Sequence, residues 1–178
     1  MSGPIEHTIL PDGLRALIRP IKPDGAEALV IAIRQLTPRS RYQRFLTART
    51  DYSVSEMDPF VKCDGVTRIG IVLAPLDEHG DPLPPVAVAH CLRDGRGSPS
   101  AEVAIVVADA WQGRGVGSAL IASLARRARE VGISRWWALM LTDNFAARRL
   151  LERHGRVLRD LTSSGLTELS LDIREHVG

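Results

Sequence analysis

The 178-residue sequence predicts a mixed α/β domain, on three observations. Residues 101–108 form a run of strand length that is apolar except at Glu102. A glycine-rich loop follows at once, and residues 117–131 then carry apolar side chains at helical spacing. A strand–loop–helix order of this kind is typical of domains in which helices cover a sheet. The length fits a single domain over residues 1–178.

Further strands and helices are expected around this core. Alternating or continuous apolar runs bounded by turn residues predict strands over residues 14–21, 66–73, 86–92 and 136–141, with a final pair over 157–161 and 166–171. Apolar stripes at helical spacing predict helices over residues 24–36, 39–46 and 144–154. Thr37 and Ser40 are both candidates to cap the second of these helices.

Composition narrows the classes of partner. The formal net charge is +2, from 23 basic and 21 acidic residues, so nothing indicates the concentrated basic face that nucleic acid requires. No apolar stretch approaches the roughly 20 residues that cross a bilayer, and the N-terminus lacks a signal-peptide pattern. Cys63 and Cys91 are too few for a disulfide framework and are expected as free thiols. We therefore expect a cytoplasmic monomer or homodimer without nucleic-acid or membrane partners.

The chemistry concentrates in the loop Gln112-Gly113-Arg114-Gly115-Val116-Gly117-Ser118. Glycines at three alternate positions let backbone N–H groups converge on one point. The helix start adds unpaired amides and the positive end of the helix dipole. The loop is therefore predicted to bind an anion, with Arg114 available for a direct charge contact. No His, Cys and Asp cluster has metal-ligand spacing, so no metal is expected.

The glycine loop has three alternative interpretations. A nucleotide-binding P-loop is excluded, because no Gly-Lys-Ser/Thr follows at the required spacing. A dinucleotide-binding Rossmann site matches Gly113-x-Gly115, and Asp143 ends the next strand where a ribose-binding acid would lie. However, Ser118 replaces the third glycine, and too little sequence remains for a doubly wound sheet. A glycine-rich turn without a ligand is the remaining alternative.

Gln112-x-x-Gly115-x-Gly117 after an apolar strand resembles the coenzyme A signature of the GNAT superfamily of N-acetyltransferases. Asn144-x-x-Ala147-x-x-Leu150 is similar to that superfamily's next helix. Residues 17–24, 40–45 and 101–112 resemble the acetyltransferase domain of bacterial Pat-type protein lysine acetyltransferases. The resemblance implies a GNAT-like fold, with a mostly antiparallel, twisted central sheet of about six to seven strands and about four flanking helices.

The resemblance also implies acetyl-coenzyme A (acetyl-CoA) as co-substrate and a primary amine as acceptor, above all a protein lysine side chain. A small-molecule amine is the alternative acceptor, and a non-catalytic module that binds acyl-coenzyme A is the competing class. The residues implied to bind the coenzyme are Ile105, Val106, Val107, Gln112, Gly113, Arg114, Gly115, Val116, Gly117, Ser118 and Asn144.

Glu102 is the candidate catalytic base. A free lysine has a pKa of about 10.4, so its amine must lose a proton before it attacks a thioester. Glu102 lies on the strand that leads into the glycine loop, and the matching acid in Pat-type enzymes is their catalytic glutamate. The alternative is a strand-end residue that is exposed or paired with an arginine. A backbone amide near Val106 is the expected oxyanion donor.

Several other residues have structural explanations beside functional ones. The tyrosine that many superfamily members use as general acid corresponds to Leu151 here, so the acid stays unassigned. His90 is expected as a satisfied core residue and His154 as a helix cap. Adjacent Trp136 and Trp137 are expected on opposite faces of a strand, one in the core and the other toward the acceptor. Arg148 and Arg149 reach either the coenzyme phosphates or solvent.

Overall fold

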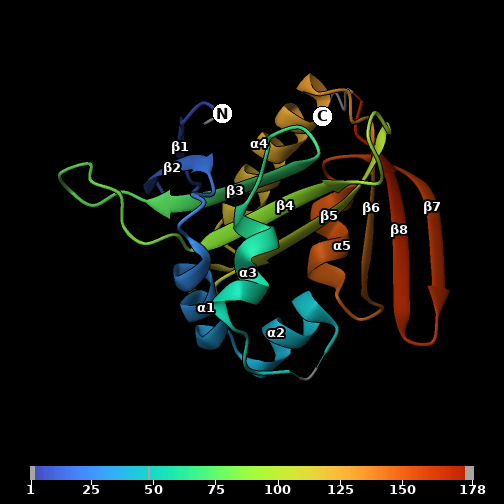
Figure 1. Ribbon diagram of the computed structural model, residues 1–178, viewed down its shortest axis with the longest axis horizontal. Helices are drawn as coiled ribbons and strands as arrows, with labels where there is room; N and C mark the ends of the chain where they lie inside the picture. The colour runs from blue at the N-terminus through green and yellow to red at the C-terminus, as the bar shows by residue number, and fades with distance from the viewer. Residues whose placement is uncertain (1–2, 48, 175–178) are drawn as a thin grey trace.

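The computed structural model describes residues 3–47 and 49–174 and has the expected mixed α/β architecture (Figure 1). The strands are β1 (Glu6–Ile9), β2 (Arg15–Pro20), β3 (Arg68–Pro75), β4 (Ala87–Arg93), β5 (Ser100–Val107), β6 (Arg135–Leu141), β7 (Arg156–Ser163) and β8 (Leu166–Asp172). The helices are α1 (Ala26–Gln35), α2 (Pro38–Phe45), α3 (Val54–Val61), α4 (Val116–Glu130) and α5 (Phe145–Glu152), with a 3₁₀ turn η1 (Asp109–Trp111).

The fold class is confirmed, but the sheet is larger than expected. Within the described residues it has eight strands instead of six to seven, and five α-helices instead of about four. The unexpected elements are β1 and α3. The strand β1 is only four residues long, and α3 contains Pro59, which normally marks a helix boundary. The short length of β1 and the proline inside α3 explain why neither element stands out in the sequence.

The eight strands form one sheet in the order β1-β2-β3-β4-β5-β6-β8-β7. Neighbouring strands pair antiparallel, except that β5 and β6 pair parallel. That exception follows from the connection, because the loop and α4 between the two strands carry the chain back across the sheet. The β7–β8 turn places Ser164 and Gly165 at φ 52° and 79°, as a tight two-residue hairpin requires.

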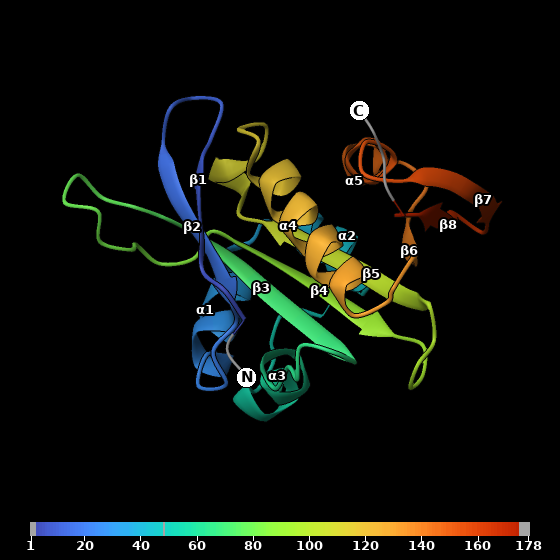
Figure 2. The ribbon, with the colours of Figure 1, turned by 90° about the horizontal axis from the view of Figure 1, so that it is seen from above.

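The helices form two layers on opposite faces of the sheet. Helix α4 packs on one face against β3, β4 and β5, and its Leu120, Ile121 and Leu124 are fully buried there. Helices α1 and α3 cover the other face and form a second apolar cluster with Val72 and Val88 (Figure 2). The stripe expected on α4 therefore faces the core as its spacing predicts.

Helix α2 is tied to the end of β5. The carboxylate of Asp109, directly after β5, accepts hydrogen bonds from Thr37 N at 3.0 Å, Thr37 Oγ1 at 3.0 Å and Ser40 Oγ at 2.6 Å. Thr37 is the helix cap, since its side chain accepts from Ser40 N. These bonds hold the first turn of α2 beside the glycine loop.

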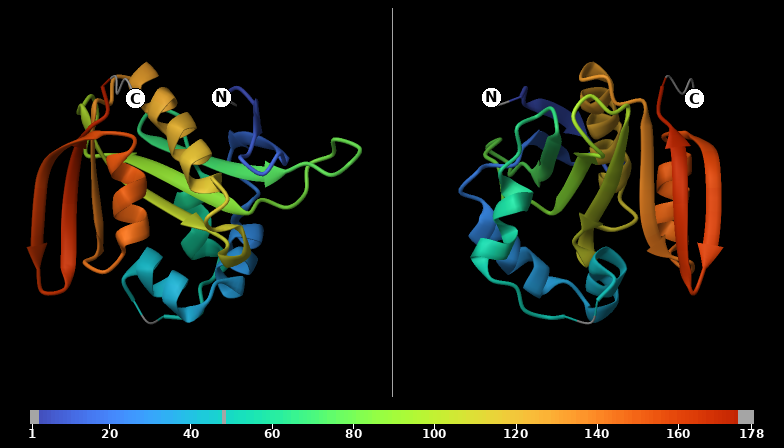
Figure 3. Two further views of the ribbon diagram at one scale, coloured as in Figure 1. Left: turned by 180° about the vertical axis from the view of Figure 1, so that it is seen from behind. Right: turned by 45° about the vertical axis from the view of Figure 1, so that its right-hand side comes forward.

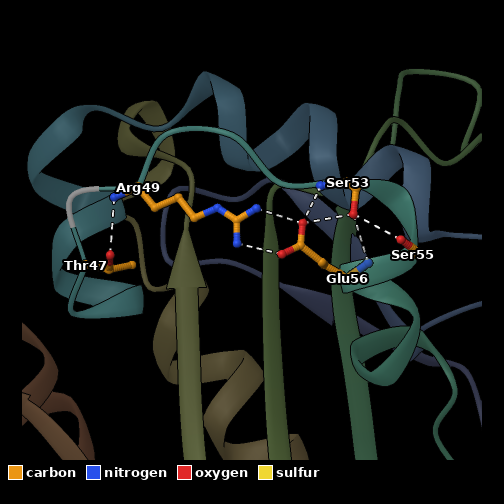
Figure 4. Close-up of polar contacts among 5 residues, drawn as sticks. All are labelled: Thr47, Arg49, Ser53, Ser55 and Glu56. Atoms are coloured by element: carbon orange, nitrogen blue, oxygen red, sulfur yellow. Dashed lines mark hydrogen bonds and ion pairs between the residues drawn. The ribbon is translucent and has the colours of Figure 1, made fainter.

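The connection between α2 and α3 is fixed by a polar network (Figure 4). Arg49 donates two hydrogen bonds to Glu56, at 2.6 and 2.8 Å, and Ser53 and Glu56 form a capping box at the start of α3. The hydrogen bonds from Arg49 lower the pKa of Glu56 to about 2. Tyr52 lies within this connection, and its ring centroid is 5.0 Å from that of Phe45 on α2.

His90 of β4 is held neutral between the sheet and α3. Its Nε2 lies 2.8 Å from the carbonyl oxygen of Phe60, whereas its Nδ1 is buried without a hydrogen-bond partner in the described chain. Burial, and then the positive charge of Arg44, lower the pKa of His90 to about 4. The expectation of a satisfied core histidine is therefore met at one ring nitrogen only.

His90 makes the stability of the fold depend on pH. The unfolded chain binds a proton at this imidazole near pH 6.5, whereas the folded chain binds it only near pH 4. Its contribution is therefore complete above pH 6.5 and is lost as the pH falls toward 4. Between pH 7 and 5, the wild type should lose about 1–2 kcal/mol more unfolding free energy than His90→Gln. Urea unfolding at both pH values measures this difference, with the exposed His79→Gln as control. Equal pH dependence in all three proteins would contradict the assignment.

Candidate functional site

The site begins where β5 and β6 separate. The two strands are paired only from Ser100↔Arg135 to Glu102↔Trp137. Beyond that point β6 continues to pair with β8, and β5 continues to pair with β4. The group formed by β6, β8 and β7 turns away from β5 (Figure 3). The second half of β5 therefore has an edge that no strand covers in the described chain.

The hydrogen-bond register decides which backbone groups face this open edge. Asp94 N donates to Ser100 O and Ala108 N donates to Val86 O, so the even-numbered residues of β5 are bonded to β4. In an antiparallel pair, the residues between them turn their N–H and C=O groups to the opposite side. The C=O of Val103 and the backbone groups of Ile105 and Val107 therefore face the open edge, whereas the Glu102↔Trp137 pairing takes up the Val103 N–H. The backbone groups of Val106 face β4.

The glycine loop has the geometry of an anion site. Gly113 and Gly115 have φ values of 74° and 83°, a conformation that other residues rarely adopt. Gly115 caps α4 without any side-chain hydrogen bond, and Ala119 N makes the first backbone bond of the helix, to Gly115 O. The N–H groups of residues 116–118 are therefore free of intrahelical partners and available to a ligand.

A cavity of about 360 Å³ joins the open edge to this loop. Its walls come from α2, the end of β5, the glycine loop and α5. The residues that line it are Ser40, Gln43, Arg44, Ile105, Val106, Val107, Trp111, Gln112, Gly113, Gly115, Gly117, Ser118, Asn144, Ala146, Ala147, Arg149, Leu150 and Arg153. An open groove of about 580 Å³ between α2 and the end of β6 adjoins it at Gln43.

Nine of the eleven residues expected to bind the coenzyme line this cavity. The two exceptions are Arg114 and Val116. The Arg114 guanidinium lies 2.6 Å from the Asp12 carboxylate in the β1–β2 turn and 4.3 Å from the Trp111 ring centroid. The Val116 side chain is 1% exposed and belongs to the core. Arg114 is therefore engaged with a carboxylate in this structure instead of facing the cavity.

Hydrogen bonds fix the shape of the cavity walls. Gln112 Nε2 donates to Val107 O at 3.1 Å, which ties the loop to the strand end. The Asn144 side chain accepts from Ala147 N and caps α5. His154 Nε2 lies 3.0 Å from Ser118 Oγ, so this histidine joins the end of α5 to the glycine loop instead of only capping a helix.

Nine further residues line the cavity, and four of them come from α2 or from just after α5: Ser40, Gln43 and Arg44 of α2, and Arg153 after α5. The i, i+3, i+4 spacing of the first three is the available sequence signal, but it does not say what that helix face meets. On α5, Arg149 lines the cavity. Arg148 instead forms ion pairs with Glu152 and Asp160. The two arginines therefore differ: Arg149 faces the cavity, and Arg148 is held in ion pairs.

Glu102 lies at the closed end of the open edge. It stands beside Trp137 of β6, half-buried, on the sheet face that α1 and α3 cover. Within the described chain it forms no ion pair, and it interacts electrostatically with Arg44. Trp136 points to the opposite face and is 1% exposed in the core, whereas Trp137 donates to Asp94 at 2.8 Å.

The described residues contain neither a metal-ligand cluster nor a membrane-spanning helix. In residues 3–47 and 49–174, no group of three or more His, Cys, Asp or Glu side chains is arranged to hold a metal ion. None of the helices described there is both long enough and apolar enough to span a membrane. Cys63 and Cys91 are free thiols.

Comparisons with known proteins identify the family. Residues 31–155 match the family described as "Acetyltransferase (GNAT) family". "Acetyltransferase Pat" of Mycolicibacterium smegmatis is 31% identical over 148 residues, which cover 79% of this chain but 40% of that protein. An acetyltransferase of Pseudomonas aeruginosa is 30% identical over 144 residues, which cover 79% of this chain and 74% of that protein.

Solved structures agree with these relatives. The GNAT domain of S. lividans PAT has a TM-score of 0.80 and 33% identity, over 94% of this chain and 96% of that domain. A cAMP-binding acyltransferase from Mycobacterium smegmatis has a TM-score of 0.66 and 25% identity, over 97% of this chain and 48% of that one. The resemblance read from residues 112–117 and 144–150 is confirmed, and the chain belongs to the GNAT family of acetyltransferases.

Proposed function

We propose that this chain, acting as one domain over residues 1–178, transfers the acetyl group of acetyl-CoA to a primary amine. The observation that carries the proposal is the continuity of the site. One strand runs from the candidate base Glu102 along an open backbone edge into an anion-binding loop. The loop receives the diphosphate, and the open edge receives the pantetheine arm.

The open edge supplies the partners that the pantetheine amides need. The C=O groups of Val103 and Ile105 and the N–H of Val107 hydrogen-bond to the arm as a neighbouring strand would. The diphosphate accepts from the amides of residues 116–118. Arg149 and Arg153 line the cavity and add positive charge for the phosphates. No resident cofactor or metal takes part in the proposed reaction.

The chemical step is direct attack. Glu102 accepts a proton from the acceptor amine, directly or through a water, and the amine nitrogen bonds to the thioester carbonyl carbon. The carbon–sulfur bond then breaks, and the coenzyme thiolate leaves and takes up a proton. The Ile105 N–H is the proposed oxyanion donor, because the Val106 N–H faces β4.

A covalent acyl-cysteine is not part of this mechanism. Burial raises the pKa of the Cys63 thiol to about 11 and that of Cys91 to about 12. Both thiols are therefore protonated at neutral pH, and a thiol is a much weaker nucleophile than a thiolate.

The acceptor we propose is a lysine side chain of a cytoplasmic protein. Support comes from the similarity to "Acetyltransferase Pat" and to the GNAT domain of S. lividans PAT. The open groove beside α2 adjoins the coenzyme cavity at Gln43, so a long side chain lying in the groove can approach the coenzyme. A mass-spectrometric screen of a lysate incubated with acetyl-CoA tests this acceptor class. If only small amines were acetylated, a small-molecule amine would replace the protein lysine as the proposed acceptor.

Gly115→Ala should weaken coenzyme binding. The substitution forces alanine to φ 83° and places its Cβ 2.6 Å from Pro11 Cδ, so the loop must move. We expect about tenfold or more weaker coenzyme A binding by calorimetry, as the loss of one or two phosphate hydrogen bonds implies. Gly80→Ala is the matched control, because Gly80 has φ 90° in a distant loop with open space around it. Equal coenzyme affinity in both variants would contradict the placement of the diphosphate.

Glu102→Gln should abolish turnover while it spares coenzyme binding. The amide keeps the shape of the side chain but cannot accept the amine proton, so kcat should fall about 10²–10⁴-fold. Calorimetry should give a dissociation constant for acetyl-CoA close to that of the wild type. Glu27→Gln, which removes an exposed carboxylate from α1, is the control and should keep full activity. Unchanged turnover in Glu102→Gln would refute the assigned role. A chain that binds the coenzyme but acetylates no amine in a broad panel would be a sensor.

A further inference from the structure

Arg44 of α2 is a cation without an ion-pair partner beside the candidate base. In the described chain no carboxylate lies within ion-pair distance of its guanidinium. The guanidinium carbon instead lies 5.0 Å from the Phe45 ring centroid and 6.0 Å from that of Phe60. Burial lowers the pKa of Arg44, and Glu102 and Tyr52 act in the opposite direction. The side chain lines the coenzyme cavity together with Val106.

Tyr52 places a second unused donor in the same region. Its hydroxyl oxygen is buried and has no hydrogen-bond partner in the described chain. Its ring packs on Phe45, and the Arg49–Glu56 network of Figure 4 fixes the connection that carries it. An unpaired buried hydroxyl costs about 1–3 kcal/mol, so a protein rarely keeps one without a ligand that fills it.

The position of these donors limits which ligand group they meet. His90 packs edge-on against Phe60 and is opposite Ala104 on β5, so the Phe60 side of Arg44 lies over the strand segment next to Glu102. Arg44 lines the same cavity as the glycine loop, but its neighbour Gln43 also lines the open groove beside α2, where we propose that the acceptor enters. A group bound here therefore belongs to the acceptor side, next to the attacking amine.

We infer that Arg44, with the Tyr52 hydroxyl, is a specificity-determining pair that binds a carboxylate carried by the acceptor close to its reactive amine. An aromatic-flanked guanidinium binds a carboxylate strongly, because both are planar and the surroundings exclude water. Glu102 then takes the proton of an amine whose own carboxylate is held away from it by Arg44. The inference rests on the proposed acetyl transfer and narrows its acceptor class.

Two sources supply this chemistry, and paired acceptors distinguish them. One pair is a blocked peptide with glutamate beside its lysine and the same peptide with glutamine. The other pair is a free amino acid and its carboxamide. In one of the two pairs, the wild type should prefer the carboxylate member by about tenfold or more in kcat/KM, as a charge-assisted hydrogen bond implies. The pair that shows the preference identifies the source.

Substitutions assign this preference to its residues. Arg44→Gln should reduce the ratio to about twofold or less, through KM of the carboxylate member. Tyr52→Phe removes a hydroxyl that has no partner, so it should fold at least as stably and reduce the ratio partly. Arg34→Gln is the matched control, because it removes an equal charge from α1 at an exposed ion pair, and it should keep the ratio.

Other results would contradict the inference or the proposed function. Equal kcat/KM within both pairs, or a preference that survives Arg44→Gln, would overturn the inference. A kcat that falls equally for both members of a pair would give Arg44 a role in transition-state stabilisation and also overturn it. If no acceptor is acetylated, the proposed function fails, and calorimetry of each acceptor with the coenzyme A complex decides the inference separately. Equal affinity of both members of each pair would then overturn it.

Discussion

The separation of β5 from β6 after Glu102 and Trp137 is the constraint on which the rest of the site depends. Backbone N–H and C=O groups in a folded protein need partners. The register pairs the even-numbered residues of β5 with β4 and leaves the Val103 C=O and the backbone groups of Ile105 and Val107 on an edge that β6 does not cover. An extended ligand with its own amides fits that edge, because it completes the sheet where the protein strand is absent. Helices α2 and α5 flank this edge and close the cavity around it.

The same strand sets the distance between the two chemical functions of the site. From Glu102 to Val107 an extended strand covers about 17 Å. The anion-binding loop begins one short turn later, and Gln112 holds that loop against Val107 O. The base and the diphosphate site are therefore rigidly spaced by secondary structure instead of by flexible loops, which favours a ligand with an anion at one end and a reactive group at the other. Asp109, just beyond the end of β5, accepts a hydrogen bond from Ser40 of α2. The end of the same strand therefore also positions Arg44.

The sequence predicts the site better than its surroundings. The glycines at 113, 115 and 117 and the apolar strand before them are close in sequence, and the structure brings nine of the eleven expected coenzyme-binding residues into one cavity. The ion pair of Arg114 with Asp12 could not be predicted, because Asp12 lies 102 residues earlier in the chain, in a turn. The cavity-lining face of α2 was missed for a similar reason: helical spacing gives a face but not its neighbour. Strand β1 and helix α3 depend on tertiary packing and capping, which outweigh their short length and Pro59.

Hydrogen–deuterium exchange with and without acetyl-CoA tests the central claim most directly, because it reports on backbone amides themselves. If the coenzyme completes the sheet, exchange should slow both in residues 103–107 and in residues 113–118, while the β7–β8 hairpin remains unchanged. Slower exchange in the loop alone would leave the diphosphate site standing but contradict a pantetheine arm on the open edge of β5. No change in either segment would contradict the whole account.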